Sequence, residues 1–284
     1  MKKIIATAVA AAFAVPVYAA DITISGDQEF SWQSNNGRTT ASLDGDFNVK
    51  ASTETANGLS VSAAININEE ANDDGGAVLS ISGPFGKVDL GDTSSAVDAI
   101  DDTTDFGYVL TQGSPNQDGS VLWTLPSMIP GLTVYVSASA DTSDGAAQDS
   151  AATAAPDTDA HTGVAIKYSV AGLSVRYGQN DNDDGTENAL VAATYGVGGL
   201  SVAVETHTAT AVDGTEVDTE TVGVSYSMGD LTAAVETMEN GTDDFTTLGI
   251  HYSLGGGVTA FVETTENDND AADEAMAVGL TMKF

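Results

Sequence analysis

The sequence predicts an all-β fold, a transmembrane antiparallel β-barrel of sixteen strands in which the loop after the fifth strand folds into the pore. Three observations lead to this prediction. Apolar and polar side chains alternate along short segments, the connections alternate between tight turns and long polar loops, and the last segment ends on an apolar residue. An even strand number with two kinds of connection is typical of outer-membrane barrels.

The first residues have the pattern of an export signal. Lys2 and Lys3 form a positive start, the apolar stretch 4–17 is too short to span a bilayer, and Val17 and Ala19 provide small residues at the spacing of a cleavage site. An ordinary core helix is the alternative for this stretch. We expect residues 1–19 to be a cleaved signal peptide and residues 20–284 to form the barrel domain.

The charge of the chain is strongly negative, with 42 acidic and 8 basic residues. Such a chain repels the phosphates of nucleic acids, so we expect no nucleic-acid partner. It attracts cations into any cleft that it lines. The chain has no cysteine, which excludes disulfides and thiolate metal sites.

Sixteen segments alternate with a period of two residues, which indicates strands with one apolar and one polar face. In the third segment, for example, Leu59, Val61 and Ile65 share one face. Most of the segments have about the 9–11 residues that a tilted transmembrane strand needs. The predicted strands are 23–32, 46–54, 59–68, 77–83, 86–91, 120–125, 131–140, 162–170, 172–179, 187–197, 199–207, 219–228, 230–238, 245–254, 257–265 and 274–284.

The connections differ in length according to the strand that they follow. Tight turns follow the even-numbered strands, as at 56–58, whereas longer acidic loops follow the odd-numbered strands, as at 69–76 and 180–187. This sorting predicts short turns at one rim of a barrel and long polar loops at the other.

Four hairpins repeat one pattern, in which a tyrosine on the apolar face precedes a turn that contains glycine. These tyrosines are Tyr168, Tyr195, Tyr226 and Tyr252. A ring with an apolar body and a polar tip suits a membrane interface, and four at one height would form half of an aromatic girdle. Cross-strand tyrosine pairing in an ordinary sheet is the alternative.

The last strand ends on its apolar face at Phe284. We expect it to pair with the first strand near residues 23–30, because pairing removes both sheet edges and unpaired backbone groups are costly in lipid.

Residues 92–119 interrupt the alternation. This segment contains Val97, Ile100 and other apolar residues that need a packing partner, so we expect it to fold into the barrel and narrow it. Four of its carboxylates are the candidate constriction residues: Asp98, Asp101, Asp102 and Asp105. The alternative is that these aspartates only solvate a surface loop or cap a short helix around 95–100.

The alternation also assigns side chains to the lumen. Lys50, Lys167 and Arg176 are the candidate basic residues of the pore wall. Carboxylates that line a water-filled constriction favour cations and repel anions.

The sequence indicates no enzyme. The three histidines lack metal-ligand spacing, and no G-x-S-x-G motif occurs. We expect no catalytic residue, no cofactor and no dedicated metal site, although the acidic loops could bind Ca²⁺ or Mg²⁺ loosely.

Four motifs resemble those of the Gram-negative general porins of alphaproteobacterial type: DITISG at 21–26, GPFGKVDLGDT at 83–93, the repeated GLSV hairpins and the terminal Phe284. The resemblance covers the whole chain and implies a trimer of sixteen-stranded barrels, each with its third extracellular loop in the pore. Pores of this family usually carry an arginine cluster opposite that loop. The chain without its first 19 residues has only these basic residues: Arg38, Lys50, Lys87, Lys167, Arg176 and Lys283.

The function implied by the resemblance is passive diffusion of small hydrophilic solutes and ions through a water-filled channel, here with a preference for cations. Two alternatives stay open: a substrate-selective channel of the same fold, and a plugged barrel with a structural or adhesive role. The implied location is the outer membrane of a Gram-negative bacterium, in contact with its lipid, with both termini in the periplasm.

Overall fold

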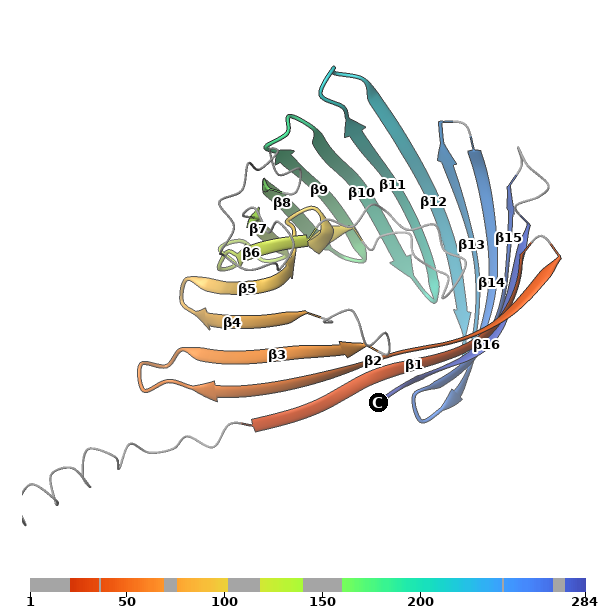
Figure 1. The fold of residues 1–284 in the computed structure, drawn as a ribbon, viewed down its shortest axis with the longest axis horizontal. Coiled ribbons are helices and arrows are strands. Elements are labelled where there is room, and N and C mark those ends of the chain that lie inside the picture. Colours follow the sequence, from red (N-terminus) through yellow and green to blue (C-terminus); the bar gives the residue numbers. More distant parts are fainter. Residues whose placement is uncertain are drawn as a thin grey trace, which may run out of the picture.

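The computed structural model describes residues 21–35, 37–68, 76–101, 118–139, 160–241, 243–267 and 274–284. They form sixteen strands, each paired antiparallel with its neighbours in the chain, and β1 pairs with β16 (Figure 1). The sheet is therefore a closed barrel, as the sequence predicts. The described residues contain no helix long and apolar enough to cross a membrane.

The strands follow one another around the ring in sequence order. Their bounds are β1 Asp21–Asn35, β2 Arg38–Glu54, β3 Ser60–Asn68, β4 Ala77–Gly83, β5 Gly86–Ser94, β6 Asp118–Thr124, β7 Leu132–Ser139, β8 His161–Val170, β9 Leu173–Asn182, β10 Glu187–Val197, β11 Leu200–Thr210, β12 Glu216–Met228, β13 Leu231–Asn240, β14 Asp243–Gly255, β15 Val258–Asn267 and β16 Ala275–Lys283. A 3₁₀ helix, η1, spans Asp98–Ile100 between β5 and β6.

Several strands extend beyond their predicted ends at the rim that carries the odd-to-even connections. β1 and β2 stay in register up to the pair Asn35 and Arg38, so the long loop predicted between them is wrong. The connection between β13 and β14 is short as well, because β13 ends at Asn240 and β14 begins at Asp243. The backbone ladder continues here through polar residues, whose side chains give no apolar alternation to detect.

The two faces of the barrel differ as the alternation predicts. Large apolar side chains are exposed on the outer face, among them Trp32, Ile65, Ile166 and Leu248. Side chains at the alternate positions of each strand point into the bore, the space that the ring of strands encloses. Its charged residues include Asp27, Glu29, Lys50, Lys87, Asp89, Lys167, Arg176, Glu205, Glu236 and Glu263.

The four repeated tyrosines lie on the outer face and are about half exposed. The ring of Tyr195 lies beside Gly172, and the ring of Tyr226 lies beside Gly199, each a turn glycine of the neighbouring hairpin. Both glycines have positive φ, and each accepts a backbone hydrogen bond from the next hairpin, at 2.9 Å. The glycine turns therefore join neighbouring hairpins at this rim.

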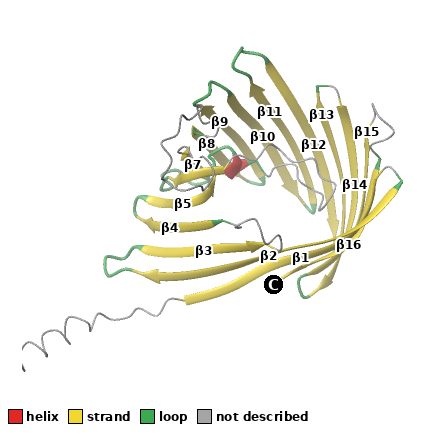
Figure 2. Cartoon of the chain, in the orientation of Figure 1, coloured by secondary structure: helices red, strands yellow, loops and turns green. Residues whose placement is uncertain are grey.

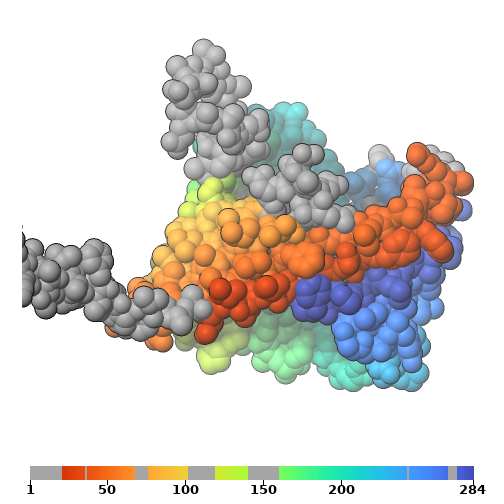
Figure 3. Space-filling model, turned by 60° about the horizontal axis from the view of Figure 1, so that its bottom comes forward, coloured from red at the N-terminus to blue at the C-terminus, as the bar shows by residue number. Residues whose placement is uncertain are grey.

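The ring closes between the first and the last strand. Figure 3 shows β1 and β16 side by side on one face of the molecule. Phe284 follows β16 on the outer parity and is half exposed. The strand pairing leaves neither β1 nor β16 as a free sheet edge.

Candidate functional site

The segment that follows β5 lies against the inner wall of the barrel. The Ala96 N–H donates to Ser137 Oγ at 2.8 Å, and Asn180 Nδ2 donates to Ser95 Oγ at 2.9 Å. Ser137 on β7 and Asn180 on β9 both have the inward parity. Figure 2 shows the short helix of this segment in front of the concave wall of strands. Residues 95–101 therefore pack against the inward-facing side of this wall.

Apolar contacts add to these hydrogen bonds. Val97 and Ile100 are buried, with 4% and 2% of their surface exposed, in a cluster with Ala165, Leu190 and Ala192 on the inner faces of β8 and β10. Complete burial of an aliphatic side chain contributes about 1.5–3 kcal/mol relative to full exposure. Leu190 thus contributes an apolar contact where the alternation alone would place a water-facing side chain.

Arg176 binds this segment directly. One terminal nitrogen of its guanidinium donates to the carbonyl oxygen of Ile100 at 2.8 Å. Lys167 is its register partner on β8, so these two predicted wall residues are neighbours. Lys50 lies apart from them on β2. The three predicted basic residues therefore do not form one cluster.

Two of the predicted constriction aspartates belong to the described part of this segment. Asp98 begins η1 and is half-buried, and Asp101 follows η1 and is buried. The backbone N–H of Asp98 donates to Ser95 Oγ at 3.1 Å. The side chain that accepts this hydrogen bond before η1 is therefore a serine and not one of the aspartates. Asp102 and Asp105 lie outside the described residues. A constriction lined by all four aspartates stays a prediction.

The wall opposite the docked segment is acidic. β9 lies half-way around the sixteen-strand ring from β1. Glu29 on β1 is the register partner of Asp44 on β2, and Asp27 and Glu263 share their inward parity. Lysines occur there too: Lys283 is the register partner of Asp27, and Lys50 is on β2. Asp44 precedes the alternating segment 46–54 and was therefore not among the predicted wall residues, whereas β2 extends over it.

One pair on this wall is buried. His251 Nε2 lies 3.0 Å from Glu263 Oε1, and both side chains are largely or fully inaccessible to solvent. The Phe261 ring meets the His251 ring edge-on, with centroids 6.5 Å apart. Hydrogen bonding to the imidazole satisfies a carboxylate that would otherwise be costly to bury.

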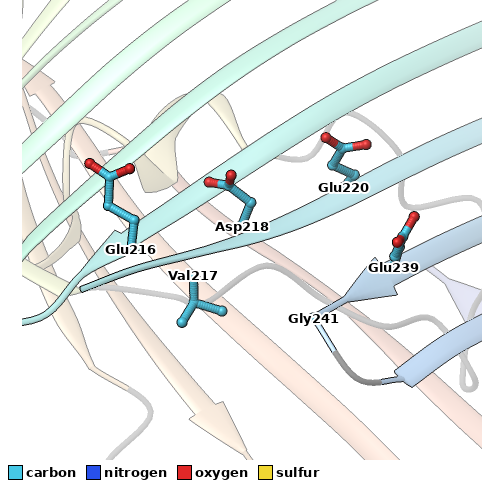
Figure 4. Close-up of a pocket in the computed structure, with 6 residues that line it drawn as sticks. All are labelled: Glu216, Val217, Asp218, Glu220, Glu239 and Gly241. Atoms are coloured by element: carbon cyan, nitrogen blue, oxygen red, sulfur yellow. The ribbon is translucent and has the colours of Figure 1, made fainter.

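The start of β12 and the end of β13, at the rim of the odd-to-even connections, carry a second group of carboxylates. Glu216, Asp218, Glu220 and Glu239 line a pocket of about 350 Å³. In Figure 4 the three acidic side chains of β12 lie on one side of the strand and Val217 lies on the other. Among the residues that the structure describes, no cluster of three or more His, Asp or Glu side chains could hold a metal ion. We therefore treat this pocket only as a source of negative potential.

Two turns at the rim of the odd-to-even connections, 183–186 and 211–215, stabilise the charged form of an aspartate. Thr186 donates to Asp184 through its hydroxyl at 2.7 Å and through its backbone N–H at 2.9 Å. The hydroxyl bond, followed by the backbone bond, lowers the pKa of Asp184. Thr215 lowers the pKa of Asp213 in the same way.

Comparison with known proteins identifies relatives of this barrel. A family model described as Gram-negative porin matches residues 6–272. No curated protein matches the chain.

Solved structures match over 93–94% of this chain and the whole of each matched chain. A porin refined at 1.8 Å resolution has 22% identity and a TM-score of 0.69. A mutant of the Rh. blastica porin has 18% identity and a TM-score of 0.71. A loop L8 deletion mutant of OmpT, an outer membrane protein of Vibrio cholerae, has 14% identity and a TM-score of 0.74. At these identities the structures show a shared fold.

Proposed function

The chain belongs to the Gram-negative porin family and is therefore a barrel channel of the outer membrane and not an enzyme, and we propose that it conducts small hydrophilic solutes and ions with a preference for cations. The solute gradient drives the flow. No cofactor takes part in this function.

The observation that carries the cation preference is the acidic wall opposite the docked segment. Glu29, Asp27 and Asp44 lie on β1 and β2, whereas the half-buried Asp98 lies across the bore near β8 and β9, on the side that also carries Lys167 and Arg176. Carboxylates on both sides raise the local concentration of cations and repel anions. Lys50 and Lys283 weaken this field without reversing it, since carboxylates outnumber lysines on these strands.

The orientation of the barrel in the outer membrane follows from its two rims and its outer face. We place the rim with the glycine turns and Phe284 in the periplasm, and the rim with the long loops outside the cell. The exposed tyrosines then lie at the inner lipid interface. The family resemblance supports a homotrimer, and residues 1–19 have the features of a signal peptide that is removed on export.

Planar-bilayer recording of the purified protein tests the proposal. We expect stepwise conductance and, in a KCl gradient, a reversal potential displaced toward the potassium equilibrium potential. A folded protein without conductance would refute the channel and support a plugged barrel. A displacement toward the chloride potential would refute the cation preference. Block of the ion current by one solute class would instead identify a substrate-selective channel.

A further inference from the structure

We infer that Gly163 and Gly178 form a glycine socket in the inner wall that positions residues 95–101, and that this docking sets the open cross-section of the channel. The inference rests on the proposed function, because conduction is one of its readouts. Neither glycine has a left-handed φ, as both lie in regular strands. Glycine inside a strand weakens it and often marks close approach of another segment.

Gly178 makes room for the apolar part of the docked segment. A Cβ at this position would lie 3.0 Å from Ile100 Cδ1, 3.1 Å from Val97 Cγ2 and 3.1 Å from Ala165 Cβ. Three simultaneous contacts of this length exceed what a packed interior tolerates without movement. Any side chain larger than hydrogen therefore competes with Val97 and Ile100 for the same space.

Gly163 makes room for the two polar side chains that bind the docked segment. A Cβ there would collide with Asn180 Oδ1 and would lie 2.6 Å from Ser137 Oγ. These are the two side chains that bind Ser95 and the Ala96 N–H. Gly163 and Asn180 are register partners, as are Ala165 and Gly178, so the two glycines occupy neighbouring inward positions.

β9 binds the segment at three successive inward positions. Asn180 bonds to Ser95, Gly178 faces Val97 and Ile100, and Arg176 bonds to the Ile100 carbonyl. Contacts of three kinds in this order fix both the position and the direction of the segment along the strand. Arg176 is accordingly a positioning residue for the channel as well as a charge in its wall.

Enlarging Gly178 should push the segment away from the wall and into the bore. We expect Gly178→Val to lower the single-channel conductance and to add open-channel noise, and Gly178→Ala to change both less. Gly196→Val is the matched control, because Gly196 also faces inward on β10 and a Cβ there would meet nothing closer than the Leu200 carbonyl at 3.9 Å. Heat-modifiable electrophoretic mobility verifies that each barrel is folded.

Folded Gly178→Val with the conductance and noise of the wild type would overturn the inference. A second test does not need that variant to fold. The chain has no cysteine, so the pair Ser95→Cys and Asn180→Cys should crosslink on oxidation, because the two native side chains are in hydrogen-bond contact. A folded double variant that does not crosslink would also contradict docking at the socket. A crosslinked barrel whose wild-type parent does not conduct would refute the proposed function instead.

Discussion

Phe284, the last residue of the chain, exchanges two backbone hydrogen bonds with Gly26 of β1. The Gly26 N–H donates to the Phe284 carbonyl at 3.0 Å, and the Phe284 N–H donates to the Gly26 carbonyl at 2.9 Å. The Phe284 ring meets the Phe47 ring edge-on at 5.5 Å. A Cβ on Gly26 would lie 3.0 Å from the Phe284 ring, so the missing side chain allows the ring to cover this position. The closure of the barrel therefore extends to the final residue.

Deletion of Phe284 should destabilise the folded barrel more than Phe284→Leu does. The deletion removes both backbone bonds, with a net contribution of about 0.5–1.5 kcal/mol each, together with the ring contact. Phe284→Leu keeps the backbone bonds and loses mainly the aromatic pair, which contributes about 0.5–1.5 kcal/mol. Reversible unfolding by urea in lipid vesicles measures the difference. Equal stability of the two variants would show that the last ladder bonds contribute nothing.

Gly172→Ala should destabilise the barrel more than Gly229→Ala. Both glycines have positive φ, at 84° and 63°, where alanine costs about 1–2 kcal/mol. At Gly172 the added Cβ would also stand 2.5 Å from the Gly196 carbonyl, whereas at Gly229 it would meet nothing within 4 Å. The same unfolding assay separates backbone strain from the steric contact. If both variants lose the same stability, the close approach at the hairpin junction is unimportant.

The order of strands and the two faces could be predicted from the sequence because both follow from side-chain alternation. The number of strands, the outward tyrosines and the inward parity of Glu29 and Arg176 all depend on that local signal. The outer ends of the strands could not be predicted, because polar residues such as Asp218 continue the backbone ladder without alternating. The positions on β7 and β9 against which residues 95–101 dock could not be predicted either. The partners Ser95 and Asn180 are far apart in the chain, and only the glycine inside the strand, Gly178, gave a local sign of close approach.

Arg176→Met should increase open-channel noise more than Lys167→Met. Both substitutions remove one positive charge from neighbouring positions of the inner wall, so both should shift the selectivity further toward cations. The bond to the Ile100 carbonyl belongs to Arg176, so its loss loosens the docked segment. Single-channel recording at fixed salt compares the two variants. Equal noise would show that the bond does not restrain the segment.

Thr186→Val should raise the pKa of Asp184 toward its ordinary value, because it removes the hydroxyl donor that lowers this pKa most. A carboxyl group whose pKa is lowered in the folded state stabilises the fold above its unfolded pKa, and this stabilisation is lost as the pH falls through the folded value. NMR titration of the carboxyl carbon below pH 5 measures the shift. Thr215→Val is the matched control: it should change the pKa of Asp213 and leave that of Asp184 unaltered.

The most direct test of the acidic bore is the reversal potential of the wild type and of the double variant Glu29→Gln with Asp44→Asn in a KCl gradient at low salt, where screening is weakest. Asp184→Asn is the control, since it removes a charge from a turn between β9 and β10, away from β1 and β2. We predict a potassium-selective wild type, a clear loss of selectivity in the double variant and little change in the control. An anion-selective wild type, or a double variant as selective as its parent, would contradict the account.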